Sequence, residues 1–466
     1  MKTTTLRNLW TAVVVLGLGT GCGSTVQVKG RVTDGEGTQS QGLVSGALPI
    51  GGSGTVAAAT QVRASTVGPD GKLTVVGEAK LEAQGRYTLD VPAGEERLVL
   101  QAVDASGQVV ASALLEAAGE SQGNTAPPMD GESSLEAEVF MQMMADARAE
   151  TVDMVDLRAR INANMAAAAR QGASTNEAFR ARVKSLADSV RAAQQTEMEM
   201  YAKAGVQTSQ SALFQQEFAA AAALNVALNA AVEAGGSTEQ AYEKFHADLR
   251  AAAERVGAKA EQQAQSERAA SASFSATVKA RLSAQDAQPL VDAALRASAS
   301  QEARASAAAL TAILTAANAS DAAKQQAVAA GTSLRTQVRA SATAAAAAQA
   351  FAHFGASVAT GADVKATVLG SYLGVTSTNQ LAVSSAVQAT VSAAATLDAS
   401  LDAAASVVTS NDANVTLLAT KTAEAYHAYA TSVRAQASAL SAFGTRASPA
   451  VELLLVAEGS FELSQQ

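Results

Sequence analysis

The sequence predicts an α+β protein in which a small β-sandwich is followed, as a separate domain, by a long, alanine-rich antiparallel helical bundle. Between residues 25 and 118 apolar and polar residues alternate, as in half-buried strands. After Gly131 the apolar residues recur about every 3.6 positions, as in amphipathic helices. Hydrophobic residues make up 48% of the chain but aromatic residues only 4%, which favours closely packed, alanine-faced helices over a large sandwich.

Residues 1–21 are typical of an export signal peptide. Lys2 and Arg7 place positive charge ahead of the apolar stretch Leu9–Leu18. That stretch is about ten residues long, whereas a membrane-spanning helix needs roughly 20 apolar residues. We therefore predict that this segment directs export and does not anchor the protein as a helix.

The single cysteine of the chain, Cys22, directly follows the signal segment. The small residues Thr20 and Gly21 precede it, and this arrangement resembles the lipobox of bacterial lipoproteins. The family has leucine three places before its cysteine, and this sequence departs from the pattern with Gly19. The alternative is an ordinary signal peptide cleaved nearby, which would leave Cys22 as a free thiol or remove it.

The lipoprotein resemblance implies that Cys22 is the lipid-attachment residue, with acyl chains such as palmitate, and that residues 22–24 form the anchored N-terminus. Several acyl chains on one residue suffice for stable membrane attachment. In the family, an aspartate after the cysteine retains the protein at the inner membrane, but this chain has Gly23 there. The resemblance therefore implies an outer-membrane location in a Gram-negative host.

The segment 25–118 has the pattern of a small β-domain. Apolar residues alternate with polar ones over residues 26–32 and again over 87–91. The apolar runs Leu98–Val103 and Val109–Leu115 are predicted to be the closing pair of strands. Several short strands separated by glycine-containing turns are typical of a sandwich.

Two stretches carry a second family resemblance. KGRVTD at residues 29–34 and GRYTLDVPAG at residues 85–94 resemble the opening strand, the G-x-Y/F-x-L strand and the following turn of carboxypeptidase regulatory-like, or transthyretin-like, β-sandwiches. The glycine-rich insertion Gly42–Gly54 departs from that family. The resemblance implies a structural or carbohydrate-facing module without catalytic activity.

Acidic residues at the ends of the predicted loops are possible calcium ligands: Asp34, Glu36, Asp70, Asp90 and Asp104. They lack the regular ligand spacing of a calcium-binding loop. Aspartates in turns commonly accept hydrogen bonds from their own backbone. We favour this second explanation and predict no metal site.

We expect residues 119–131 to be an interdomain linker, residues 132–460 to be the helical domain and residues 461–466 to be a polar tail. The sequence SSLE at residues 133–136 predicts a capping box at the first helix. That helix is predicted to continue as far as Gly172.

Later helices are predicted from similar signals. Ser237-Thr238-Glu239-Gln240 is predicted to begin a helix that runs to about Leu282. Pro289 is predicted to end that helical stretch, because proline lacks the backbone N–H that an interior position needs.

Two long stretches of the helical region carry no charge. No Asp, Glu, Lys or Arg occurs in residues 340–362 or in residues 366–397. These stretches are either helices covered within the bundle or by partners, or the two arms of a membrane-inserting hairpin. They are richer in Ala, Ser, Thr and Gln than leucine-type membrane spans are, so we favour the first interpretation.

Nothing in the sequence supports catalysis. His246, His353 and His427 lie far apart, and none has a second histidine at the i+3 or i+4 spacing of a helical metal site. The sequence contains neither a G-x-S-x-G elbow nor a phosphate-binding G-x-x-x-x-G-K-[ST] loop. We therefore predict that the protein is not an enzyme and has no cofactor.

The charged residues of the helices are predicted to be structural. Glu136 and Glu138 are two positions apart, as are Glu197 and Glu199, so the members of each pair face different sides of a helix and cannot act together. The cluster Arg158–Arg160 is predicted to lie on a solvated helix face.

The predicted role is that of a membrane-anchored envelope lipoprotein with a structural or protein-interaction function. Its partners are the membrane, through the lipid, and an unidentified protein. The net charge of −9 argues against nucleic acid, because no basic excess exists to bind phosphates. The alternative is a membrane-active effector whose uncharged helices in residues 340–397 insert into a bilayer.

Overall fold

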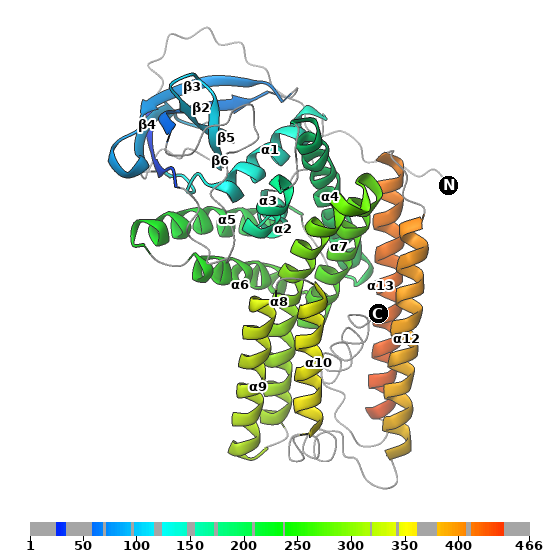
Figure 1. Ribbon diagram of the computed structural model, residues 1–466. Coiled ribbons are helices and arrows are strands. Elements are labelled where there is room, and N and C mark those ends of the chain that lie inside the picture. Colours follow the sequence, from blue (N-terminus) through cyan, green and yellow to red (C-terminus); the bar gives the residue numbers. More distant parts are fainter. Residues whose placement is uncertain are drawn as a thin grey trace.

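The chain contains two mainly antiparallel β-sheets followed by a helical region (Figure 1). The computed structural model describes residues 25–33, 58–68, 71–94, 97–115, 124–146, 154–171, 176–206, 210–235, 238–316, 319–341, 344–360, 380–406 and 412–441. The predicted signal peptide 1–21, Cys22 and the tail 461–466 lie outside these residues, as do the whole glycine-rich insertion Gly42–Gly54 and the candidate calcium ligands Asp34, Glu36 and Asp70.

The first sheet has three strands in the order β4-β1-β7, and the second has four in the order β3-β2-β5-β6. The strands are β1 (Thr25–Arg31), β2 (Ala59–Val67), β3 (Leu73–Lys80), β4 (Arg86–Pro92), β5 (Leu98–Asp104), β6 (Val109–Leu115) and β7 (Asn124–Thr125), with a short 3₁₀ turn at Ala83–Gly85 before β4. The segments predicted to be strands from their alternation and apolar runs are confirmed as β1, β4, β5 and β6.

Side chains of both sheets contribute to one buried cluster. Its larger members are Val28, Val62, Tyr87, Leu89, Leu98, Leu100 and Met129. Gly77 of β3 allows the two sheets to approach each other closely, because a Cβ at this position would lie 2.4 Å from the backbone oxygen of Asp90 in β4. A glycine is therefore required where β3 passes over β4.

Strands β5 and β6 of the second sheet are buried on both faces, which explains their apolar runs. Leu98 and Leu100 belong to the cluster between the sheets, whereas Val99 and Leu114 belong to a larger cluster shared with the helices. A strand that is covered on both faces is apolar on both, so its apolar and polar residues need not alternate. The predicted division into separate domains is therefore crossed by a continuous hydrophobic core.

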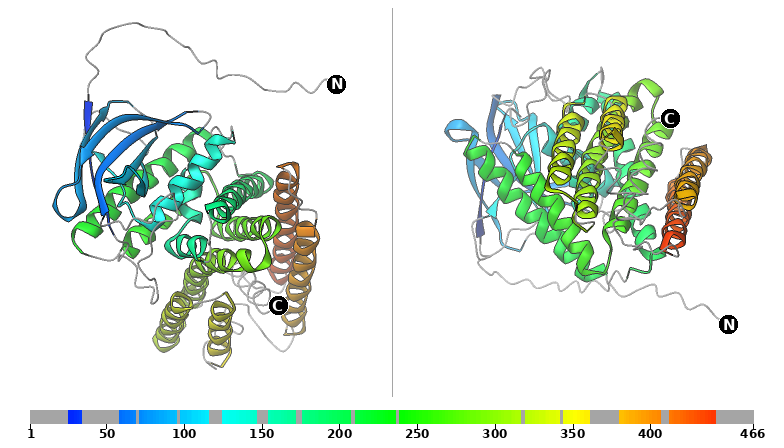
Figure 2. Two further views of the ribbon diagram at one scale, coloured as in Figure 1. Left: turned by 45° about the horizontal axis from the view of Figure 1, so that its top comes forward. Right: turned by 90° about the horizontal axis from the view of Figure 1, so that it is seen from below.

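The helical region follows the sheets. The helices are α1 (Gly131–Ala145), α2 (Met154–Arg160), α3 (Ala163–Arg170), α4 (Asn176–Lys203), α5 (Gln210–Glu233), α6 (Glu239–Arg255), α7 (Ala260–Arg281), α8 (Ala284–Ala316), α9 (Asp321–Ala340), α10 (Ala344–Thr360), α12 (Gln380–Ser406) and α13 (Asp412–Ser441). Helix α4 packs along α7, and α13 packs against both (Figure 2). Helices α8, α9 and α10 lie side by side, and α12 packs mainly on α13.

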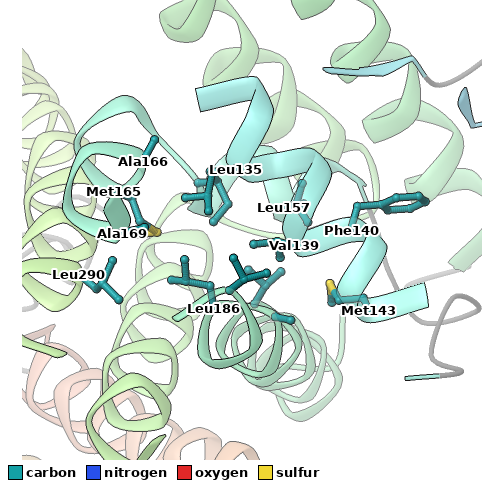
Figure 3. Close-up of a cluster of buried hydrophobic side chains, with 14 of the residues drawn as sticks. Leu135, Val139, Phe140, Met143, Leu157, Met165, Ala166, Ala169, Leu186 and Leu290 are labelled. Atoms are coloured by element: carbon teal, nitrogen blue, oxygen red, sulfur yellow. The ribbon is translucent and has the colours of Figure 1, made fainter. Parts of the chain in front are cut away.

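The large cluster lies where the sheet meets the helices. Leu135, Val139 and Met143 recur at i+4 along α1 and point toward Leu157 of α2 and Leu186 of α4 (Figure 3). Further side chains of this cluster come from α3, α7 and α8. This core fixes the positions of α2 and α4, which carry the ionic groups described below.

The start of α1 differs from the prediction. The N-cap is Asp130, whose carboxylate accepts hydrogen bonds from the backbone amides of Glu132 at 2.8 Å and Ser133 at 3.0 Å. Ser133 occupies the N3 position of the capping box, not the N-cap position. Residues 124–131, which lie within the predicted linker, form β7 and this cap, so that this stretch is part of the fold.

The later helix boundaries also differ. The single helix predicted from Leu135 to Gly172 is divided into α1, α2 and α3, and Asn162 caps α3 by accepting a hydrogen bond from the Met165 amide at 3.0 Å. The helix predicted to run to Leu282 ends at Arg255, where Gly257 takes a positive φ. Pro289 lies inside α8, which begins at Ala284, so the break precedes the proline.

Candidate functional site

Helix α2 is seven residues long and carries two buried arginines. Arg158 is 3% exposed and Arg160 is 7% exposed. Residues two positions apart on a helix point in different directions. Arg158 accordingly reaches the sheet and Arg160 reaches the long helices, so the prediction that both lie on a solvated face is wrong.

Arg158 forms what we call the sheet junction, which consists of Arg158, Glu136, Leu114 and Ala221. The guanidinium donates to the backbone oxygen of Leu114 in β6 at 3.1 Å and to that of Ala221 in α5 at 3.4 Å. Its Nε lies 3.6 Å from Oε2 of the buried Glu136 in α1. One side chain thus connects α2 to a strand and to two helices.

The first turn of α1 covers the outer edge of β6. The backbone amide of Ser112 donates to Oγ of Ser134 at 3.0 Å, and Oγ of Ser133 donates to the backbone oxygen of Ser112 at 2.7 Å. Together with Arg158 at Leu114, these side chains occupy backbone groups that an additional strand would otherwise bind.

A second acidic group lies beside the sheet junction. The hydroxyl of Tyr242 in α6 donates to the carboxylate of Glu132 in α1. Burial raises the pKa of Glu132 well above its ordinary value, and the nearby charges of Asp130 and Glu136 raise it further. The environment therefore favours the neutral form of Glu132.

Arg160 forms what we call the bundle junction, which consists of Arg160, Glu197, Glu267 and Ser271. Nη1 lies 2.8 Å from Oε1 of Glu267 in α7, and Nη2 lies 3.3 Å from Oε2 of the same carboxylate. Nη2 also lies 3.3 Å from Oε2 of Glu197 in α4, and Nη1 donates to Oγ of Ser271 at 3.4 Å. One guanidinium is thus shared by two carboxylates.

The surroundings of the bundle junction shift the ionisation of its groups. Burial raises the pKa of Glu197 to about 7, although the charge of Arg160 acts in the opposite direction. Burial also raises the pKa of Tyr201, whose hydroxyl bonds Glu197. Beside the junction, burial lowers the pKa of His246 in α6 to about 4, so that its imidazole is neutral at pH 7.

The chemistry that this arrangement can perform is limited, because its carboxylates are bound by arginine and tyrosine side chains. Among the residues that the structure describes, no three His, Cys, Asp or Glu side chains gather closely enough to hold a metal ion.

The predicted lipid-attachment residue Cys22 lies outside the described part of the chain. The three histidines lie on separate helices, α6, α10 and α13.

Two smaller predictions are confirmed. Glu197 and Glu199 face different neighbours, since Glu199 accepts a hydrogen bond from the Thr420 hydroxyl of α13 at 3.0 Å. Asp104 accepts hydrogen bonds from the backbone amides of Ser106 at 2.8 Å and Gln108 at 2.9 Å, as a turn aspartate does. The Ser106 hydroxyl bond is the largest of the effects that lower the pKa of Asp104.

The uncharged stretches 340–362 and 366–397 include α10 and much of α12. None of the described helices combines the length and the apolar character that crossing a membrane requires. Residues 361–379, which join these two helices, lie outside the described ranges.

No known relative guides the interpretation of these junctions. No protein-family model matches the chain, and neither a curated protein nor a solved structure is similar to it.

Sequence reasoning missed both junctions. Arg160 and Glu267 are 107 positions apart, and Arg160 and Glu197 are 37 apart, so that no local pattern connects them. A signal was present in α2 itself, where Arg158 and Arg160 alternate with Leu157 and Ala159, so that the two arginines point in different directions and cannot share one solvated face.

Proposed function

We propose that this protein is a non-catalytic lipoprotein of the cell envelope, anchored at the outer membrane through Cys22, whose helical region binds another protein. The observation that supports the non-catalytic role is that the buried ionic groups connect helices and strands to one another. Arg158, Arg160 and their carboxylate partners connect α1, α2, α4 and α7, and each of these groups contacts an oppositely charged group within the fold.

The helices farthest from the sheets supply the surface for a partner. Helix α12 packs mainly on α13, and Leu381 at its beginning is 79% exposed. On α9, Val328 is 55% exposed. A lipid anchor would confine these faces to the membrane surface, where a higher local concentration makes weak contacts effective.

We also propose that the two sheets form a sandwich of the carboxypeptidase regulatory-like kind. The cluster shared by both sheets supports this proposal. So does the pairing of the two resembling stretches, since Gly30 in the first lies opposite Tyr87 in the second. A crystal structure of the full chain tests it, because a sandwich requires the two sheets to face each other across that cluster.

Detergent-phase partitioning tests the anchoring. We expect the wild-type protein to enter the detergent phase and Cys22→Ala to remain in the aqueous phase, with Gly23→Ala as the matched control that keeps the cysteine. Mass spectrometry should find an acylated N-terminal cysteine. An unmodified N-terminus on a membrane-free protein would refute the anchor.

The interaction role needs a separate test. Cross-linking from a photoreactive residue at position 381 or 328 should capture a protein partner in the envelope, whereas one at Ala169, which is buried, should not. Leakage of liposomes treated with the purified protein would contradict the binding role and favour bilayer insertion.

A further inference from the structure

The bundle junction contains more carboxylates than cations. Arg160, which is 7% exposed, is the guanidinium that both Glu197 and Glu267 contact. Two carboxylates that share one buried site do not both ionise readily, because the second charge is no longer compensated.

The geometry distinguishes the two carboxylates. Both oxygens of Glu267 contact Arg160, at 2.8 and 3.3 Å, in a bidentate arrangement. Glu197 contacts Arg160 through one oxygen at 3.3 Å and bonds the hydroxyl of the buried Tyr201. Glu197 is therefore the group that carries the proton.

We propose that the bundle junction is a pH-sensitive contact between α2 and the long helices: it is neutral and closed while Glu197 is protonated, and it loosens when that proton leaves. Deprotonation places a second negative charge beside a single guanidinium. Because α2 also holds the sheet through Arg158, loosening at Arg160 weakens the connection between the sheet and the helical bundle. This inference goes beyond the proposed function and does not depend on it.

Other charged groups surround this contact. Asp156 of α2 acts on Arg160, and His246 of α6 interacts with both Glu267 and Arg160. Glu217 of α5 acts on Tyr201, and Arg250 of α6 and Arg304 of α8 act on His246. Arg304 is itself engaged by Glu243 at 2.9 Å. Because His246 is neutral above about pH 4, it supplies no charge to compensate Glu197 in the neutral range.

Hydrogen exchange of the full-length protein tests the proposal at pH 6 and pH 8, with rates corrected for the intrinsic effect of pH. One pH unit above a pKa of about 7, the deprotonated form of Glu197 exceeds the protonated form by about tenfold. We expect peptides that cover α2 and its contact regions in α4 and α7 to exchange several-fold faster at pH 8 than at pH 6 in the wild type.

The variant Glu197→Gln should abolish this pH dependence, because it keeps the hydrogen-bonding shape without the charge. Glu199→Gln, two positions away and facing α13, is the matched control and should behave as the wild type does. If Glu197→Gln fails to fold, Glu267→Gln gives the same test, since it leaves one carboxylate for one guanidinium. A wild type without pH dependence, or a folded Glu197→Gln that retains it, would overturn the proposal.

Discussion

Gly30 of β1 shows how a single missing side chain supports the β-region. It pairs with Tyr87 of β4, and a Cβ at residue 30 would lie 2.2 Å from the Tyr87 hydroxyl oxygen. Gly30→Ala must therefore displace a buried ring. Overpacking of this kind costs about 1–3 kcal/mol, and we expect that loss in the free energy of unfolding measured by urea denaturation.

Tyr87→Phe is the matched control. Burial raises the pKa of Tyr87, and within the described ranges its hydroxyl has no hydrogen-bond partner. Removing an unsatisfied buried hydroxyl should leave the stability unchanged or raise it by about 1 kcal/mol. A clear loss of stability in Tyr87→Phe would show that the hydroxyl is hydrogen-bonded in the folded protein.

Residue-scale prediction from the sequence succeeded where the cause is local. The Asp104 turn involves only residues up to Gln108, and its pattern is visible in the sequence. The environment of Arg158 and Arg160 could not be predicted, because their partners come from distant segments. Burial of a charged residue depends on which segments surround it, and a local charge pattern does not contain that information.

At the scale of elements, α2 depends on its arginines. Arg158→Met would remove a cation from beside the buried Glu136 and a donor from the Leu114 backbone oxygen. Removing one partner of a buried ion pair typically costs about 3–5 kcal/mol, and we expect such a loss in chemical denaturation. Arg180→Met, at an exposed position of α4, is the control and should cost less than about 1 kcal/mol.

The coverage of β6 by α1 makes a separate prediction. Ser134→Ala removes the oxygen that accepts the hydrogen bond of the Ser112 amide. We expect a loss of about 1 kcal/mol in unfolding free energy and faster hydrogen exchange at the Ser112 amide. Unchanged protection of that amide would show that another group covers the strand edge.

The prediction of elements was accurate for their type and less so for their ends. The change of period after Gly131 identified the helical region, but Asp130 rather than Ser133 caps α1 because both residues can cap and the sequence does not rank them. Pro289 lies in the second turn of α8, five residues after its first residue Ala284, and does not end the helix. The covered outer face of β5 and β6 followed from tertiary packing that the alternation pattern could not show.

At the scale of the whole molecule, acid sensitivity follows from His246. Its pKa falls from 6.5 to about 4 on folding, so its contribution to stability is complete above pH 6.5 and is lost as the pH falls toward 4. The shift corresponds to at most about 3 kcal/mol. We expect the stability of the wild type relative to His246→Gln to fall by up to this amount between pH 7.5 and pH 4 in urea titrations.

The buried carboxylates change stability in the opposite direction. Burial raises the pKa of Glu138 from 4.5 to about 7, so its contribution to stability is complete below pH 4.5 and is lost as the pH rises through 7.

Comparison of the wild type with His246→Gln at each pH isolates the contribution of the histidine from that of the carboxylates. A difference that stays constant with pH would show that His246 has the same pKa in the folded and unfolded chains.

The position of α2 has a consequence for how the molecule melts. A chain that combines a β-region with a helical region would ordinarily unfold in two steps, one for each part. Here a single short helix is bonded to both, and Val99 and Leu114 of the sheet share their core with the helices. Differential scanning calorimetry should therefore show one endotherm whose calorimetric and van't Hoff enthalpies agree, and Arg158→Met should separate it into two.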